Sequence, residues 1–189
     1  MMRNEFKVLV WLAGLMWLGS GAALAEEESF GSWLFSVSRQ KEIRPVENQV
    51  YQEECGACHF AYQPGLLPAK SWARLLDEKA LSDHFGENAE LDKDTLKTIH
   101  DYTTGNAADT SYYKRSRKIA LATEKEEALL RITEVRYIKR KHHEIPERMI
   151  KGNKDVKSLS YCDACHTKAD KGIFDEDTVR IPNYPDWED

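Results

Sequence analysis

The sequence predicts a mainly α-helical protein in two parts. Apolar residues recur at helical spacing in several segments, whereas the alternating pattern of a β-strand is almost absent. A small, polar stretch at 105–111 is the best candidate for a boundary between the two parts. Because 189 residues are enough for one or two small domains, we expect an N-terminal domain over 26–108 and a C-terminal domain over 109–189, behind a removable leader at 1–25.

Spacing and turn residues define the elements of the N-terminal domain. Residues 49–58 predict a first helix, and the turn-rich segment 59–68, which contains two prolines, follows it. Ser71 is a plausible N-cap for a second helix. Residues 81–90 are polar and contain glycine, so we expect a loop there, and residues 91–102 have the apolar spacing of a third helix.

The C-terminal domain has a less regular pattern. Residues 112–141 carry apolar side chains at helical spacing and are expected to be mostly helical, until Pro146 stops the pattern. Residues 151–157 predict a charged loop, and the tail after residue 166 is expected to be largely irregular.

All four cysteines of the chain belong to two copies of one motif, Cys-x-x-Cys-His. The residues are Cys55, Cys58 and His59 in the first copy and Cys162, Cys165 and His166 in the second. This motif is the attachment sequence of a c-type haem. One helical turn lets both thiols reach the vinyl groups on one edge of the porphyrin, and the histidine that follows binds the iron through a neutral nitrogen. The sequence therefore predicts two covalently attached haem c groups.

Other uses of paired cysteines fit the sequence less well. In a zinc ribbon the two pairs usually lie roughly 15–20 residues apart, whereas 103 residues separate Cys58 from Cys162 here. A thioredoxin-like redox pair needs one Cys-x-x-Cys beside a strand and does not need the histidine. A disulfide framework would not place a histidine after both pairs.

Residues 1–25 have the composition of a secretory signal peptide. A short basic start with Arg3 and Lys7 precedes an apolar run, and Ala23-Leu24-Ala25 is a suitable cleavage site. The apolar run is short for a permanent membrane span of about 20 residues, although an uncleaved anchor is the alternative. We expect export to the periplasm and no membrane span after cleavage, and export agrees with haem attachment outside the cytoplasm.

Charge is unevenly distributed along the chain. After removal of 1–25, 25 basic and 31 acidic side chains remain, so that the net charge is −6 and nucleic acid is an improbable partner. Residues 77–109 have a net charge of −6, residues 110–157 of +7, and residues 158–189 of −5. Most of these charges are expected to form a solvated surface, and the asymmetry is also suited to steering the protein onto redox partners.

Each iron needs a second axial ligand unless its site is open. Histidines outside the two motifs are His84, His100, His142 and His143, and Met149 is the only methionine after the leader. The first part has the order of a class I cytochrome c, in which the loop before the last helix supplies this ligand, and His84 lies in that loop. His100 lies in the middle of a predicted helix and is expected to be exposed. His142 or His143 is expected to serve the second haem, with Met149 less favoured. Two histidines on each iron would favour electron transfer over catalysis.

With these motifs the chain resembles the bacterial diheme cytochrome c family of small exported electron carriers. In the first part the matching residues are 55–59, Tyr62, Pro64, 66–68, Ser71, Trp72 and 83–89. In the second part they are 131–134, 142–146, 162–166, Ala169, Gly172, Phe174, Glu176, Ile181 and Pro182.

The resemblance implies a class I cytochrome c-like N-terminal haem domain and a smaller helical or irregular C-terminal haem domain. It places the distal ligands on His84 and His142, each in a bis-histidine site. It also implies that the protein is no enzyme and exchanges electrons with another redox protein, either a monohaem oxygen-binding cytochrome or a membrane cytochrome b. The alternatives are a diheme enzyme of the peroxidase type and a diheme subunit of a periplasmic oxidoreductase such as a nitrate reductase.

Further roles are expected for residues near the haems. The carbonyl of Pro64 or Pro68 is a candidate acceptor for the second ring nitrogen of His59. Aromatic side chains that are expected to pack on the porphyrins, or simply in the core, are Trp72, Phe85, Tyr102 and Phe174.

Overall fold

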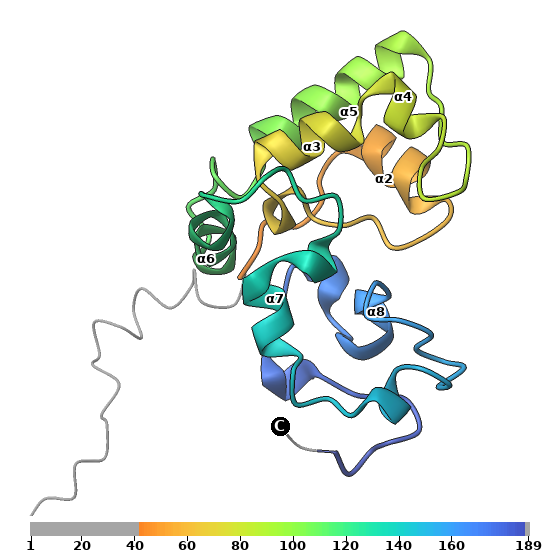
Figure 1. Cartoon of the computed structure of the whole chain (residues 1–189), viewed down its shortest axis with the longest axis vertical. Helices are drawn as coiled ribbons and strands as arrows, with labels where there is room; N and C mark the ends of the chain where they lie inside the picture. The colour runs from red at the N-terminus through yellow and green to blue at the C-terminus, as the bar shows by residue number, and fades with distance from the viewer. Residues whose placement is uncertain (1–41, 188–189) are drawn as a thin grey trace, which may run out of the picture. The chain divides into compact units, whose positions relative to one another are not determined.

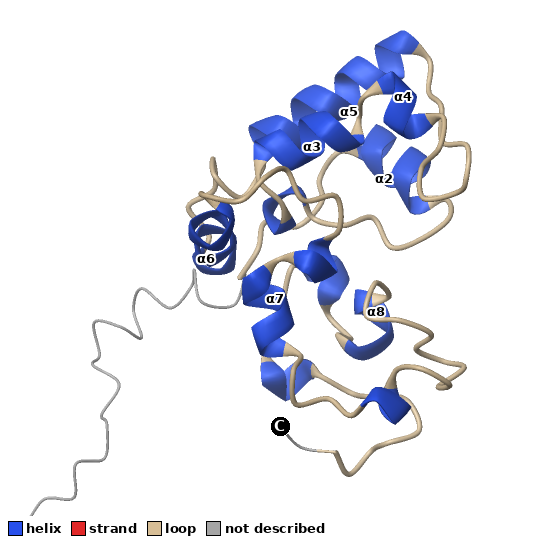
Figure 2. Ribbon diagram, in the orientation of Figure 1, coloured by secondary structure: helices blue, strands red, loops and turns tan. Residues whose placement is uncertain are grey.

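Helices are the regular elements of residues 42–187, which the computed structural model describes (Figure 1, Figure 2). Within this stretch extended pairing is limited to two isolated bridges, between His84 and Glu87 and between His166 and Val179. The predicted mainly α-helical class is confirmed. The predicted signal peptide lies outside the described residues, and no helix among the described residues has the length and apolarity needed to cross a bilayer.

The first part contains four α-helices and one 3-10 helix. They are α2 (Gln49–Gly56), η2 (Pro64–Leu66), α3 (Ala69–Leu75), α4 (Glu78–Leu81) and α5 (Lys93–Gly105). Local side chains cap three of them. The side-chain oxygen of Asn48 accepts a hydrogen bond from the N–H of Tyr51, Asp77 accepts from the N–H of Lys79, and Asp92 accepts from the N–H groups of Asp94 and Thr95. The helices therefore start close to where the sequence predicts them.

The prediction that Ser71 caps the second helix is wrong. The helix α3 begins at Ala69, directly after Pro68, whose extended backbone suits an N-cap position. The side chain of Asp109 accepts a hydrogen bond from the N–H of Ala69 at 2.9 Å and so caps the helix from a distant part of the chain. Ser71 lies inside the helix and is buried.

Aromatic side chains form the centre of the first part. In Figure 1, α5 runs beside α3, and α5 also packs against α2. Tyr51 on α2 contacts the rings of Trp72 on α3 and Tyr102 on α5, with ring centres 6.3 and 5.5 Å apart. The indole N–H of Trp72 donates to the carbonyl of Pro64 at 2.7 Å. This packing fixes the first Cys-x-x-Cys-His motif, which follows α2, against the rest of the first part.

The second part contains short helices separated by long turns. They are α6 (Lys114–Thr123), η3 (Ile132–Glu134), α7 (Arg136–Lys141), η4 (Glu147–Met149), α8 (Cys162–Cys165), η5 (Ala169–Lys171) and η6 (Glu176–Thr178). The predicted helical stretch 112–141 is interrupted between Thr123 and Arg136. Because α6 ends at Thr123, Glu124, Glu126 and Glu127 lie at and beyond its C-terminus, where the helix dipole disfavours negative charge. The ammonium group of Lys70 binds the carbonyls of Thr123 and Glu126 and holds the chain in the interrupted form.

A segment at the beginning of the described chain contacts its far end. We call residues 42–46 the N-terminal strap. The N–H of Ile43 donates to the carbonyl of Gly172 at 3.1 Å, and the N–H of Arg115 donates to the carbonyl of Glu42 at 3.2 Å. Ile43 is fully buried. Gly172 has a φ of +72°, and a Cβ atom there would overlap the carbonyl oxygen of Ile43, so glycine is required at this position.

Further bonds join the two halves of the sequence. The hydroxyl of Tyr62 donates to the carbonyl of Ser160 at 2.5 Å, and the side-chain amide of Gln63 donates to the carbonyl of Ala169. The described residues belong to one compact unit. The expected division into domains over 26–108 and 109–189 remains a prediction.

Candidate haem sites

The first motif lies at the end of α2 and in the turn after it. Cys55 is half-buried on the last turn of α2, Cys58 is exposed, and His59 follows. The Nδ1 atom of His59 lies 2.8 Å from the carbonyl oxygen of Phe60, so that its Nε2 atom is the nitrogen available to a metal. The prediction that Pro64 or Pro68 accepts this bond is wrong, because their carbonyls bind groups of the adjacent helices and the indole of Trp72.

His84 faces His59. The centres of the two imidazole rings are 6.4 Å apart, and their planes are inclined by 25°. An imidazole nitrogen binds a transition metal at about 2 Å, and this nitrogen lies about 1 Å from the centre of its own ring. Two imidazoles on opposite sides of one metal ion therefore have ring centres about 6 Å apart. The separation of His59 and His84 therefore fits a single metal ion bound between the two imidazoles.

The loop that carries His84 is held by its own backbone and by an arginine from the second part. The N–H of His84 donates to the carbonyl of Glu87 at 2.7 Å, and the N–H of Glu87 donates back at 3.2 Å. Phe85 has a φ of +57°, which is uncommon for a bulky residue. The guanidinium of Arg131 lies 4.0 Å from the centre of the Phe85 ring and covers one face of it.

The second motif forms a single helical turn, α8. The N–H of His166 donates to the carbonyl of Cys162 at 2.8 Å, and the bridge between His166 and Val179 holds the chain next to the histidine. His142 approaches from the end of α7. The ring centres of His142 and His166 are 6.0 Å apart, with planes inclined by 77°. This separation also matches two imidazoles on one metal ion.

The structure distinguishes His142 from His143. The Nδ1 atom of His142 lies 2.8 Å from the carbonyl oxygen of Ile138, which leaves Nε2 for a metal. The side chain of His143 is 66% exposed and lies near the carboxylate of Glu144. His142 is therefore the histidine that is paired with the second motif.

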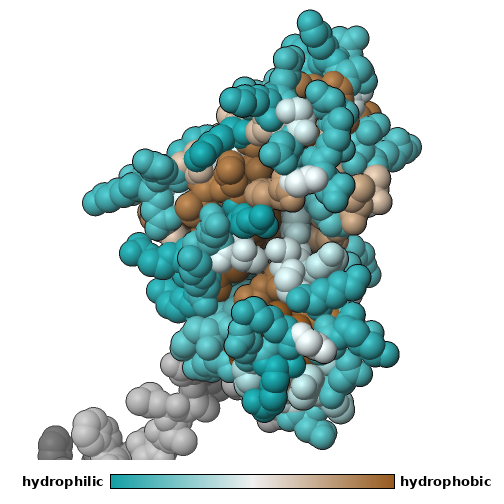
Figure 3. Space-filling model, turned by 45° about the vertical axis from the view of Figure 1, so that its right-hand side comes forward, coloured by the Kyte–Doolittle hydropathy of each residue, from teal (hydrophilic) through white to brown (hydrophobic). Residues whose placement is uncertain are grey.

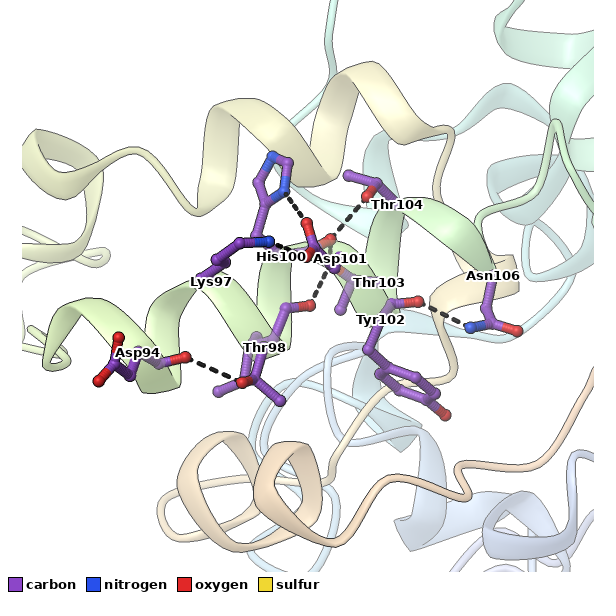
Figure 4. Close-up of polar contacts among 10 residues, drawn as sticks. Asp94, Lys97, Thr98, His100, Asp101, Tyr102, Thr103, Thr104 and Asn106 are labelled. Carbon is purple, nitrogen blue, oxygen red and sulfur yellow. Dashed lines mark hydrogen bonds and ion pairs between the residues drawn. The ribbon is translucent and has the colours of Figure 1, made fainter.

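His100 belongs to a polar surface network on α5. Its Nδ1 atom lies 3.5 Å from the carboxylate of Asp101, which also binds Lys97. Figure 4 shows the imidazole near this pair, while Tyr102 points to the opposite side of the helix. Thus His100 is placed on the helix surface, as the sequence suggests.

A cavity of about 650 Å³ surrounds the second pair of histidines. Cys162, Cys165, His142 and His166 all line it, and the remaining lining is mainly apolar. The buried ring of Phe174 lies 5.1 Å from the ring of His166, and the buried Met149 also lines the cavity. Figure 3 shows mostly hydrophilic side chains on one face of the molecule, with apolar residues visible in its hollows. The cavity has a volume and chemistry suited to a large planar apolar cofactor.

Burial lowers the pKa of two of the four paired histidines, His166 and His84. Desolvation lowers the pKa of His166 to about 4, with further contributions from His142 and Arg115. Desolvation also lowers the pKa of His84, and the nearby His59 and Arg131 act in the same direction. A neutral imidazole has the lone pair that a metal needs.

One thiol of the first pair and both thiols of the second have a raised pKa, the opposite of a redox-active cysteine. Burial raises the pKa of Cys55 to about 11 and that of Cys162 to about 12. A thioredoxin-like pair requires a lowered thiol pKa. No group of three or more Cys, His, Asp or Glu side chains in the described part of the chain is placed to hold a metal ion alone, so the two cysteine pairs do not form a shared zinc site.

Four residues contribute to these sites although the sequence did not predict their roles. Ile43 and Leu66 line the second cavity although both precede the predicted boundary. Arg131 covers Phe85 beside the first site. Arg115 lines the second cavity from α6. No spacing pattern marks these residues, because each acts through a contact with a remote segment.

Comparison with known proteins agrees with the geometry. A family model described as "Dihaem cytochrome c" matches residues 51–174. A solved diheme cytochrome c from Shewanella baltica is 40% identical, with a TM-score of 0.61, and the match covers 75% of this chain and 98% of that one. A diheme cytochrome c from Rhodobacter sphaeroides is 39% identical, with a TM-score of 0.60 and coverage of 69% and 99%.

No curated protein matches the sequence. The family match spans more than half of the chain, and the structural matches span nearly the full length of their relatives. The chain therefore belongs to the dihaem cytochrome c family, and it is a haem-based electron-transfer protein with two covalently bound haem c groups.

Proposed function

We propose that the protein is a periplasmic carrier of single electrons in which two histidines bind each iron. His59 and His84 bind the first iron, and His166 and His142 bind the second. The observation that carries this proposal is the separation of the two imidazole pairs, 6.4 and 6.0 Å between ring centres. Both values equal the distance of about 6 Å that one shared metal ion requires.

Each residue type has a separate task in this carrier. Cys55 and Cys58 hold the first haem by thioether bonds, and Cys162 and Cys165 hold the second. The bound haems supply an iron that accepts and releases one electron. Two histidines would hold each iron in one coordination, and the mainly apolar walls of the second cavity would limit the access of water to the haem. An iron whose ligands stay in place exchanges electrons with a small reorganisation energy.

Two filled axial positions favour a carrier over an enzyme. A diheme peroxidase needs an open position at one iron for its substrate. His84 and His142 each lie at a separation that closes such a position. We therefore infer that the protein has no catalytic activity of its own.

The adjacent histidines offer a matched test of the ligand assignment. In the haem-loaded protein, His142→Ala is expected to convert one low-spin iron to high spin and to allow carbon monoxide to bind the reduced form. His84→Ala should do the same at the other iron. The controls are His143→Ala and His100→Ala, which change exposed histidines. Electron paramagnetic resonance and optical titration with carbon monoxide measure both effects.

Two outcomes would overturn the assignment. One is a wild-type reduced protein that binds carbon monoxide readily at neutral pH, because this would mean an open iron and favour an enzyme. The other is a loss of low-spin signal in His143→Ala rather than in His142→Ala.

We also propose that the partner at the second haem presents an acidic surface. Lys139 and Arg140 are exposed and lie two to three residues before His142. Residues 136–151 contain six basic and two acidic side chains. A positive surface beside a haem steers an acidic partner toward it. Another haem protein, either a monohaem cytochrome or a membrane cytochrome b, is the proposed class of partner.

The periplasmic location rests on the leader at 1–25 and on the chemistry of the cysteines. The leader has the three regions of a secretory signal. Thioether attachment of haem takes place outside the cytoplasm, so an exported chain is the form that receives both haems.

A further inference from the structure

One ion pair differs from all others in residues 42–187 by its burial. The Arg115 and Glu42 side chains, which are paired, are only 16% and 15% exposed. In every other ion pair of this stretch, both side chains are at least 42% exposed. Surface pairs contribute little to stability, and a buried pair of similar volume is often no more stabilising than apolar side chains. The location of this pair therefore calls for a functional explanation.

Arg115 is held in one orientation by groups from three segments. Its Nε donates to the carboxylate of Glu42 on the N-terminal strap. Its Nη1 donates to the hydroxyl of Tyr137 at 3.2 Å, and its Nη2 donates to the carbonyl of Phe174 at 2.9 Å. Because a guanidinium presents its donors in a rigid plane, these three partners fix its position.

The pair is oriented with its positive end toward the second haem site. Arg115 lines the cavity that contains His142 and His166, whereas Glu42 is not among the lining residues. The pair of Lys141 and Glu176 has no such orientation. Both side chains line the cavity, so that their opposite charges balance each other there.

We propose that the Glu42–Arg115 pair sets the reduction potential of the second haem. Arg115 stabilises the reduced, less positive iron from inside the cavity, and Glu42 weakens this effect from behind. This inference rests on the proposed function, because it requires a haem between His142 and His166. It assigns to the strap a role in tuning a haem that is attached to the opposite end of the sequence.

Potentiometric titration of the haem-loaded protein tests the proposal, because the two partners are expected to shift the potential in opposite directions. Glu42→Gln removes the negative charge, so the potential of the second haem should rise. Arg115→Met removes the positive charge, so the potential of the second haem should fall. Each shift is expected to be about tenfold in the one-electron equilibrium constant, or about 59 mV. The potential of the first haem should not move.

The controls separate charge from loosened packing. Entry of water into the cavity would change the potential in the same direction in both variants, and this result would overturn the proposal. Arg115→Lys retains the charge and should stay near the wild-type value. The double variant Glu42→Gln/Arg115→Met should lie between the single variants, and Asp101→Asn, in an exposed pair on α5, should leave both potentials unchanged.

Failure of the inference is distinguishable from failure of the proposed function. If both haems are low-spin and neither single variant changes the second potential, the pair has no tuning role and the carrier function stands. If the wild-type second haem is high-spin, the bis-histidine assignment itself is wrong.

Discussion

At the scale of single residues, the sequence predicts the attachment sites more completely than the distal ligands. The two Cys-x-x-Cys-His motifs can be recognised directly in the sequence, because the covalent attachment of haem requires that spacing. His84 could be chosen from its position in a loop. His142 and His143 are adjacent, and the Nδ1 atom of each lies 2.8 Å from a backbone carbonyl. Only the approach of the His142 ring to His166 and the exposure of His143 to solvent separate them.

The two imidazole pairs predict two different magnetic signatures. The rings of His59 and His84 are inclined by 25°, whereas those of His142 and His166 are inclined by 77°. Nearly parallel imidazoles act on the same iron d orbital and split the pair of orbitals, but nearly perpendicular ones act on both orbitals and leave them close in energy. Electron paramagnetic resonance of the oxidised protein should therefore show one ordinary rhombic low-spin signal and one highly anisotropic low-spin signal.

Variants assign these two signals to their sites. His142→Ala should remove the highly anisotropic signal, and His84→Ala should remove the rhombic one. Two identical rhombic signals in the wild-type protein would contradict the geometry of the second pair.

At the scale of elements, local patterns predicted α2 and α5 well and failed where remote groups decide. The helices α2 and α5 have their own capping side chains, Asn48 and Asp92. The start of α3 depends on Asp109, which lies 40 residues away, so Ser71 was a misleading candidate. The interruption after α6 depends on Lys70, whose ammonium group binds carbonyls at and beyond the end of that helix.

The contact between the strap and Gly172 predicts that substitution of two glycines with similar backbone angles has different effects on stability. Gly172 and Gly152 have φ values of +72° and +83°, but only Gly172 would place a Cβ against the strap. Gly152→Ala should cost about 1–2 kcal/mol of unfolding free energy, the usual penalty of a left-handed backbone. Gly172→Ala should cost about 3 kcal/mol or more, because the strap must also move.

Urea unfolding of the haem-loaded protein, followed by haem absorbance, measures both values. Equal losses in the two variants would mean that the contact between the strap and Gly172 contributes nothing to stability.

At the scale of the whole molecule, the sequence reveals the distribution of charge but not the contacts that close the second cavity. The blocks of opposite charge are visible as counts along the chain. By contrast, Ile43 lines the second cavity, and its N–H donates to the carbonyl of Gly172. No periodic pattern in the sequence predicts such a contact.

Charge reversal near the second site should slow electron exchange with an acidic redox protein such as a flavodoxin. Lys139→Glu is expected to lower the second-order rate constant about threefold to tenfold at low ionic strength, because an approaching acidic partner would lose an attraction. The difference should disappear at about 0.5 M salt, where screening is nearly complete. Stopped-flow spectroscopy over a series of salt concentrations measures it.

The matched control is Lys125→Glu, which makes the same charge change beyond the end of α6. It should leave the rate constant and its salt dependence close to those of the wild-type protein. Equal slowing by both variants would show that net charge, rather than a surface beside the second haem, governs the encounter.

The bond between Ile43 and Gly172 also has a consequence for how the chain matures. Residues of the strap are synthesised early, and the glycine that they bind is synthesised near the end. A fragment that begins after the strap would lack part of one wall of the second cavity, and a fragment that stops before Gly172 would leave the strap bound to Arg115 but not to Gly172. Each half therefore depends on the other, and neither is expected to be stable as a separate cytochrome.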